Sequence, residues 1–171
     1  MKSLHAIKIA FLLFIFVFTA CSSRVVLPPL PGHVTSQENG AKFFVKPIII
    51  IDTRMSNEMR ENAIAMYQNL VFEKLSNLNK LALNKEEAKY ELDLIVQKYF
   101  KRNAEGYLSP FGGGPKSDHM ETLAIVKDID SGEELGRGRI FYRDPSVFGS
   151  LSRMIEDSAE EIVNYVSGKK R

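Results

Sequence analysis

The sequence predicts an α+β fold, with a single, mostly antiparallel sheet and two helices packed on one face. Residues 90–100 alternate apolar and polar side chains, as a strand with one buried face does. Residues 120–143 read as a hairpin around the turn Asp130-Ser131-Gly132. Two stretches, 56–78 and 150–167, place apolar residues every three to four positions, which is typical of amphipathic helices. Helices gathered on one face of such a sheet define the α+β class.

The first two expected elements are a strand at 47–52 and a helix at 56–78. Four successive isoleucines between Pro47 and Asp52 indicate a buried strand. Ser56 is of a type that caps helices, and Glu58 and Glu61 suit the positive end of the helix dipole. A methionine stripe can mark an adaptable binding surface, but a core role is favoured here. The expected apolar face of this helix consists of Met59, Ala63, Met66, Leu70, Phe72 or Lys74, Leu75 and Leu78.

The remaining elements follow in the order β-α-(β)-β-β-β-α. A short strand at 81–83 and a polar turn at 84–88 precede the strand at 90–100. A glycine-rich excursion at 103–119 leads to the hairpin. The closing helix ends at Gly168, because glycine commonly stops helices. Its expected inner face consists of Leu151, Met154, Ile155, Ala159, Ile162, Val163 and Val166.

Residues 1–20 have the layout of an export signal. Lys2 and Lys8 give a basic start, and every residue from Ile9 to Phe18 is apolar. That run is too short to span a bilayer, which takes roughly 20 apolar residues. The next residues, Phe18-Thr19-Ala20-Cys21, resemble a bacterial lipobox, although leucine is the usual first residue there.

The lipobox resemblance implies that Cys21 is the lipidation site. It implies a thioether to diacylglycerol, cleavage after Ala20, and acylation of the new amine by a fatty acid such as palmitate. Sulfur is the nucleophile that this chemistry needs. Cys21 is also the single cysteine of the chain, so no disulfide is expected. Two alternatives stay open, a secretory signal with an incidental cysteine and an uncleaved anchor.

Residues 21–40 are expected to be a lipid-anchored, proline-rich tether, followed by a periplasmic α+β domain at 41–171. Pro28, Pro29 and Pro31 favour extended chain that spaces rather than folds. A proline-rich ligand for another protein is the less favoured reading. Ser22 stands where an aspartate would hold a Gram-negative lipoprotein at the inner membrane, so we expect the periplasmic face of the outer membrane.

The charge balance argues against a nucleic-acid partner. The chain carries 23 Lys+Arg and 21 Asp+Glu. Lys2 and Lys8 precede Cys21, so the remainder carries 21 of each sign and is neutral. Nucleic-acid binding normally leaves a basic footprint. The basic residues Lys98, Lys101, Arg102, Arg137, Arg139 and Arg143 could instead meet an acidic partner or anionic lipid, although simple solvation is favoured.

No pattern in the sequence predicts catalytic, metal-binding or cofactor-binding residues. His119 has acidic neighbours, Asp118 and Glu121, but lacks the further ligands that a zinc site needs. Residues 128–134 begin like a calcium loop, but their glycine comes one position early. Residues 111–115 lack the Lys-Ser/Thr of a phosphate loop, and Gly136-x-Gly138 falls within a strand. We therefore expect no enzyme and no cofactor apart from the lipid on Cys21.

The run EEAKYELDLIVQKYF, followed by a DIDSGEEL turn and an amphipathic helix, resembles small periplasmic domains of Gram-negative lipoproteins. That group includes uncharacterised outer-membrane lipoproteins, domains similar to the amino-terminal domain of TolB, and CsgG-like lipoproteins. The resemblance covers residues 47–167. It implies a non-catalytic envelope module that docks to other proteins, and it carries no catalytic residues over.

The sequence thus predicts a membrane-anchored lipoprotein whose periplasmic domain is a binding or assembly module of the cell envelope. Its expected partners are membrane lipid, through Cys21, and an envelope protein. An alternative is an exported enzyme or ligand-binding protein that uses the 103–119 loop as a lid, with a pocket near Asp93, Asp118 and Glu121. A purely structural spacer is the third possibility.

Overall fold

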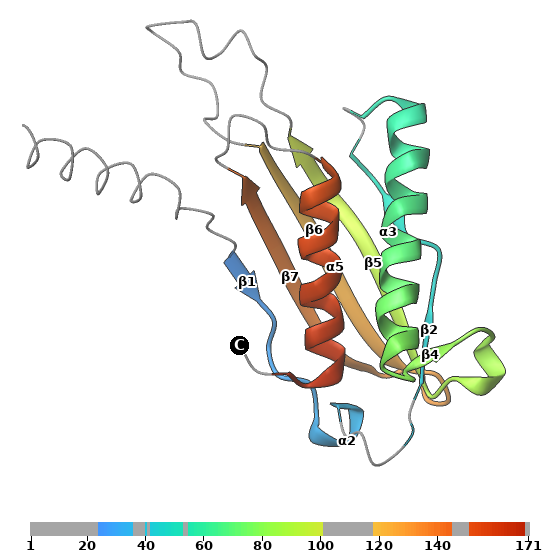
Figure 1. Cartoon of the computed structure of the whole chain (residues 1–171). Coiled ribbons are helices and arrows are strands. Elements are labelled where there is room, and N and C mark those ends of the chain that lie inside the picture. The colour runs from blue at the N-terminus through green and yellow to red at the C-terminus, as the bar shows by residue number, and fades with distance from the viewer. Residues whose placement is uncertain are drawn as a thin grey trace, which may run out of the picture.

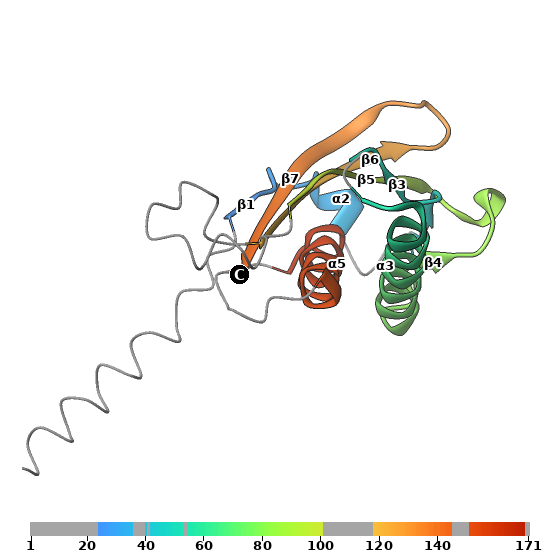
Figure 2. The same cartoon turned by 90° about the horizontal axis from the view of Figure 1, so that it is seen from above.

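A computed structural model shows a two-layer domain, with a sheet on one side and two long helices on the other (Figures 1 and 2). The structure describes residues 24–35, 40, 42–52, 55–100, 118–144 and 151–169. Both helices cover the same face of the sheet, and the core lies between the two layers. The predicted α+β class is confirmed.

Three long antiparallel strands form the centre of the sheet. They are β5 (Tyr90–Phe100), β6 (Asp118–Asp128) and β7 (Glu134–Asp144). Leu94 pairs with Ala124, and Ala124 pairs with Gly138. The predicted hairpin turn is confirmed, because Gly132 has φ 70° and the Asp128 carboxylate accepts from the Ser131 backbone N–H at 2.9 Å. A positive φ at this position of the turn favours glycine, which has no Cβ to clash.

Four short strands complete a seven-stranded sheet. β1 (Arg24–Val26) pairs antiparallel with β7, on the outer edge in Figure 1. β2 (Phe43–Val45) and β3 (Ile49–Ile50) both run parallel to β5. β4 (Leu81–Ala82), the predicted short strand, runs parallel to β2. The order is β1-β7-β6-β5-β2-β4, with β3 also paired to β5.

The strand expected at 47–52 is present only as the two-residue β3, and only alternate isoleucines of the segment are buried. β2 ends at Val45, before this segment, and the chain pairs with β5 again at Ile49, after Pro47, which has no N–H to give to a sheet. The Ile48 N–H instead donates to the Gln68 side chain at 3.1 Å. Ile49 and Ile51 are 53% and 55% exposed, because alternate residues of this segment point away from the helices.

The two predicted helices are confirmed as α3 (Asn57–Asn77) and α5 (Leu151–Ser167). Ser56 caps α3, since its hydroxyl accepts from the Met59 N–H at 3.2 Å. Gly168 follows α5 with φ 70°, as predicted for its stop. Two short helical turns accompany them, α2 (Gly32–Thr35) and the 3-10 turn η1 (Lys85–Glu87) within the predicted polar turn.

The buried face of α3 differs from the predicted one. Its fully buried side chains repeat every four residues, while Met59, Met66 and Leu70 lie beside that stripe. The difference arises because α3 must contact both the sheet and α5, and this places Tyr67 at the centre of the contact. The Tyr67 hydroxyl lies 2.5 Å from the Ser158 hydroxyl and donates to Thr122 at 3.5 Å. The buried stripe is Ala63, Tyr67, Val71 and Leu75.

Residues 24–35 belong to the domain, so a tether across 21–40 is wrong for that part of the segment. Leu30 and Val34 are buried in the core. The Lys80 ammonium donates to the Thr35 carbonyl at 3.2 Å, and the Tyr90 hydroxyl donates to the His33 carbonyl at 3.3 Å. The proline cluster therefore directs chain across the core rather than away from it. Residues 1–23, with the expected signal and Cys21, lie outside the described residues.

Candidate functional site

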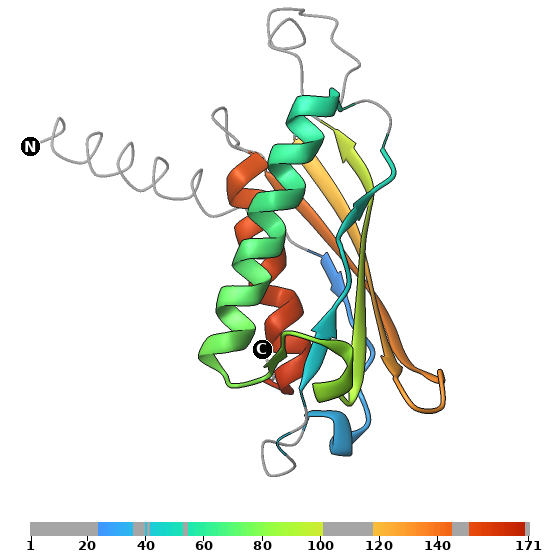
Figure 3. The same ribbon diagram turned by 90° about the vertical axis from the view of Figure 1, so that its right-hand side faces the viewer.

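The face of the sheet turned away from α3 and α5 is densely charged. Figures 2 and 3 show both long helices on the opposite side of the sheet. Alternate residues of β5, β6 and β7 point outward on this face, joined by two lysines from nearby turns. We name this surface the cationic sheet face. Its lysines are Lys46, Lys85, Lys98 and Lys127, its arginines are Arg137, Arg139 and Arg143, and its carboxylates are Glu91, Asp93, Glu121 and Glu134.

On the cationic sheet face, the carboxylates lie beneath their basic partners. Glu91 contacts Lys46 at 2.8 Å and Lys85 at 3.4 Å. Asp93 contacts Lys127 at 2.7 Å and Lys46 at 3.2 Å. The side chains of these two acids and of Glu121 are only 9–14% exposed, whereas the paired lysines and arginines are 32–64% exposed. An approaching partner therefore meets positive charge first.

Each of the three little-exposed outward carboxylates contacts two basic side chains. Glu121 is held between Lys98 at 3.2 Å and Arg139 at 3.3 Å. Burial raises the pKa of Asp93, but Lys127 and Lys46 more than offset this, and the pKa is lowered overall. The hydrogen bond to Glu91 raises the pKa of Lys46. With seven basic residues against four carboxylates, the face carries a net charge of +3 at neutral pH.

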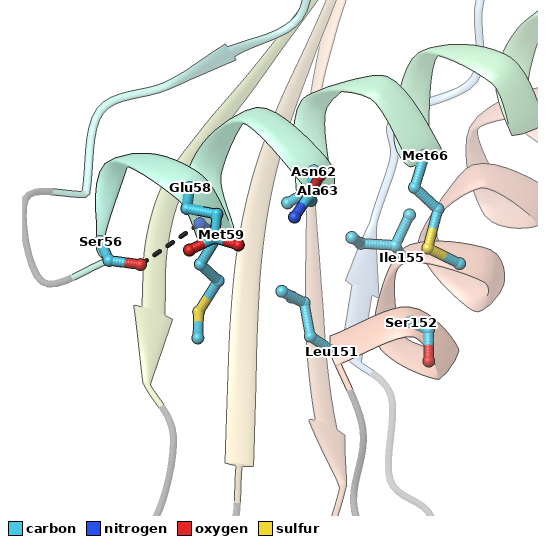
Figure 4. Close-up of a pocket in the computed structure, with 9 residues that line it drawn as sticks. All are labelled: Ser56, Glu58, Met59, Asn62, Ala63, Met66, Leu151, Ser152 and Ile155. Atoms are coloured by element: carbon cyan, nitrogen blue, oxygen red, sulfur yellow. Dashed lines mark hydrogen bonds between the residues drawn. The ribbon is translucent and has the colours of Figure 1, made fainter.

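A second feature is an open groove of about 400 Å³ between the N-terminal halves of α3 and α5 (Figure 4). Met59 and Met66 project from α3 towards Leu151 and Ile155 of α5, with polar groups around the apolar floor. Flexible thioether side chains adapt to differently shaped apolar partners. We name this surface the methionine groove; it is lined by Ser56, Glu58, Met59, Asn62, Ala63, Met66, Leu151, Ser152 and Ile155.

The start of α3, and with it the methionine groove, is positioned by Asp52 and Arg60. The buried Asp52 carboxylate accepts from the Tyr99 N–H at 2.5 Å, next to the bulge between Val96 and Lys98. Arg60 donates to the carbonyl oxygens of Asp52 and Met55 at 3.4 and 3.3 Å. These contacts tie the turn before α3 to the end of β5.

The structure separates the acids around which a lidded pocket was expected. Asp93 and Glu121 point outward and are ion-paired. Asp118 is buried, and because it precedes the outward-facing His119 in β6, its side chain points to the opposite face of the sheet. The His119 ring packs against Phe141, with 5.6 Å between ring centroids. The methionine groove includes none of these residues. Residues 101–117 lie outside the described part of the chain, with Lys101, Arg102 and most of the expected lid.

Sequence reasoning found only part of these two surfaces. Lys98, Arg137, Arg139 and Arg143 were identified as basic surface residues, and their common face is now evident. The sequence did not indicate that Lys46, Lys85 and Lys127 belong to the same face. The alternation in β5 placed Glu91 and Asp93 on the outer face, and this was the available signal for lysine partners. The residues that α5 contributes to the groove cannot be identified from a single sequence, because they depend on how the two helices pack.

No protein-family model and no curated protein sequence matches this chain. Solved structures do share its fold. Two crystal structures of the PelC dodecamer from Paraburkholderia phytofirmans, the first of them of a point variant, overlay with TM-scores of 0.61 and 0.60 at 11% and 12% identity. Each overlay covers 87% of this chain and 100% of the PelC chain.

Protein XCC0632 from Xanthomonas campestris, assigned to the family DUF330, overlays with a TM-score of 0.54 at 13% identity. That overlay covers 87% of this chain and 95% of XCC0632. At these identities the comparisons establish a shared fold. Within the ranges that the structure describes, no helix is long and apolar enough to cross a membrane.

Proposed function

We propose that this chain is a lipid-anchored protein of the bacterial cell envelope whose folded domain is a non-catalytic binding or assembly module. The anchor is the diacylglycerol and N-acyl lipid on Cys21, and no other cofactor is required. The location is the periplasmic face of the outer membrane. Its partners are membrane lipid and an envelope protein, without nucleic acid.

The observation that carries this proposal is the short distance in sequence between Cys21 and the fold. β1 begins at Arg24, and three residues of extended chain reach at most about 11 Å. Arg24 pairs with Phe141 in the second half of β7, on the outer edge of the sheet (Figure 1). A lipid on Cys21 would therefore keep the β1 edge of the domain close to the bilayer.

Two further features support a binding role. The cationic sheet face and the methionine groove lie on opposite layers of the same domain, and both suit contact with macromolecules rather than chemistry on a small substrate. PelC, which shares the fold, is a dodecamer. By analogy, assembly is the binding function that this fold favours.

Membrane fractionation with in-cell crosslinking tests the proposal. Wild type and the control variant Ser23→Ala should both appear in the membrane fraction, because neither lacks the acceptor sulfur. Cys21→Ser should lose the membrane fraction, and wild type should give a reproducible crosslinked species. Retention of Cys21→Ser in the membrane at full yield would contradict the anchor. A wild-type chain without any reproducible crosslinked species would contradict the binding role.

A further inference from the structure

The two layers of the domain carry opposite charges. The cationic sheet face has a net charge of +3, from seven basic residues and four carboxylates. The helix layer, meaning α3 and α5, has three acids on α3 and four on α5, against Arg60, Lys74 and Arg153. Seven acidic against three basic residues give that layer a net charge of −4. Complementary potentials of this kind favour association and fix its orientation.

The two surfaces also match in length. Each of the three long strands has 11 residues, or about 37 Å at about 3.4 Å per residue. α3 has 21 residues and α5 has 17, or about 32 and 26 Å at about 1.5 Å per residue. The helix layer of one copy can therefore cover most of the sheet face of another.

Apolar groups lie at corresponding positions on the two surfaces. Ile49 and Ile51 are more than half exposed on the outward side of the sheet, where β3 pairs with the middle of β5. The methionine groove opens along the N-terminal half of α3 (Figure 4). Two copies that stack without a large axial shift bring these isoleucines towards the groove, which would add apolar contact to the charge complementarity.

We infer that the partner of the cationic sheet face is the acidic helix layer of a second copy of this chain. The contact is head-to-tail, because each copy presents its sheet face to one neighbour and its helix layer to the other. Such heterologous contacts build closed rings or open filaments rather than two-fold dimers.

This arrangement rests on the proposed anchor and is compatible with it. The stacking direction is perpendicular to the sheet, and β1, which follows Cys21 closely in sequence, lies at the same height along the strands in every copy. A ring or row of copies therefore keeps all its lipids in one bilayer plane. Anionic lipid, the other natural ligand for a basic surface, would engage the sheet face alone and leave the acidic helix layer without a role.

Charge reversal on one surface tests the inference. In the sheet variant Lys85→Glu/Arg137→Glu, every buried carboxylate keeps a cation, since Glu91 retains Lys46 and Glu121 retains Lys98 and Arg139. In the helix variant Glu73→Lys/Glu156→Lys, the two acids replaced are exposed. The mature full-length chain is studied by sedimentation velocity in detergent, with micelles in large excess. Wild type should sediment as an oligomer, and each variant alone as a monomer.

Mixing the two variants gives the decisive result. The acidic sheet of one variant complements the basic helix layer of the other, and the two unaltered surfaces also match. An equimolar mixture should therefore restore oligomers of wild-type size, which also shows that both variants are folded. The controls Glu86→Lys/Glu133→Lys and Lys89→Glu/Lys169→Glu change the charge equally in turns and at the terminus, and should remain oligomeric.

Three outcomes would overturn the inference. They are a monomeric wild type, single variants that remain oligomeric, and a mixture that stays monomeric. If wild type is monomeric but binds anionic vesicles through Lys85 and Arg137, the surface is a lipid-binding face instead. A monomeric wild type that still crosslinks reproducibly to another envelope protein would leave the proposed function standing, whereas one without any crosslinked partner would remove both.

Discussion

Tyr67 shows how a single polar group can join the two layers. Its hydroxyl, on α3, meets Ser158 of α5 and Thr122 of β6. Burial raises its pKa to about 12, although the hydrogen bonds to Ser158 and Thr122 partly oppose this. Replacing Tyr67 by Phe leaves two buried hydroxyls without this partner, and the expected loss is about 1–2 kcal/mol in the free energy of unfolding. Urea denaturation measures it, and an unchanged midpoint would contradict the role.

The same residue predicts a loss of stability in alkali. A tyrosine with a folded pKa of about 12 favours the protonated form in the fold, relative to an unfolded pKa of about 10. Its contribution is complete below pH 10 and is lost as the pH rises to about 12. For Tyr67 this amounts to about 3 kcal/mol. The pKa of Tyr99 is also raised to about 12, first by burial and then by the charge of Asp118, so Tyr99 adds to the loss of stability. Unfolding curves should fall over this range, and less steeply in Tyr67→Phe.

Asp52 is the residue that joins the start of α3 to the end of β5. Because its carboxylate accepts the buried Tyr99 N–H, Asp52→Ala should cost about 1–3 kcal/mol. Asp52→Asn keeps an acceptor oxygen and should cost less. Chemical denaturation of the two variants gives the comparison. Equal losses would show that the hydrogen bond is not what stabilises this junction.

At the scale of elements, Gly136 and Gly138 of β7 make room for the N-terminal segment. A Cβ at Gly138 would overlap the Leu27 side chain and lie 3.1 Å from the Leu27 Cα and the Val26 carbonyl oxygen. A Cβ at Gly136 would overlap Leu30 and approach the Tyr165 hydroxyl. These glycines explain how residues 27–30 cross the sheet on the helix side.

Gly138→Ala should therefore destabilise the domain by about 1–3 kcal/mol, as overpacking does. Gly32→Ala is the matched control, because a Cβ there meets open space. Thermal unfolding of both variants tests the packing of residues 24–30 on β7. If Gly138→Ala is as stable as Gly32→Ala, this segment does not pack as described.

Local patterns predicted the long elements well. The alternation in 90–100, the turn at Gly132 and the Ser56 cap depend on near neighbours in sequence, and each was found where it was expected. Pairing of short strands depends on distant partners instead. Arg24–Val26 forms a strand only because the edge of β7 is available, and the prolines that follow concealed this. The isoleucine segment was misjudged for the same reason, since β5 decides which isoleucines face inward.

The candidate surfaces show the same division. The basic residues can be counted in a sequence. The sequence does not show that they lie further out from the sheet than the carboxylates of the same face. This difference, with Glu91 and Glu121 beneath and Lys98 and Arg139 above, gives the face its sign. The methionines of α3 were recognised as an adaptable stripe, and only the packing of α5 shows that they line a groove.

At the scale of the whole molecule, the account predicts a salt-sensitive assembly. Contacts between exposed charges weaken as the Debye length falls from about 10 Å at 0.1 M salt to about 3 Å at 1 M. Raising the salt from 0.1 M to 1 M should shift the sedimentation profile from oligomer to monomer. Oligomers that persist unchanged in 1 M salt would point to apolar contacts at Ile49, Ile51 and the methionine groove as the main source of association.

The proposed function depends on lipid on Cys21, which anchors the domain to a bilayer. Intact-mass spectrometry of the mature chain, purified from membranes, tests it most directly. We expect a chain that begins at Cys21 and carries the added mass of a diacylglycerol and a further acyl group. A chain that still begins at Met1, or one that begins at residue 21 with an unmodified thiol, would contradict it.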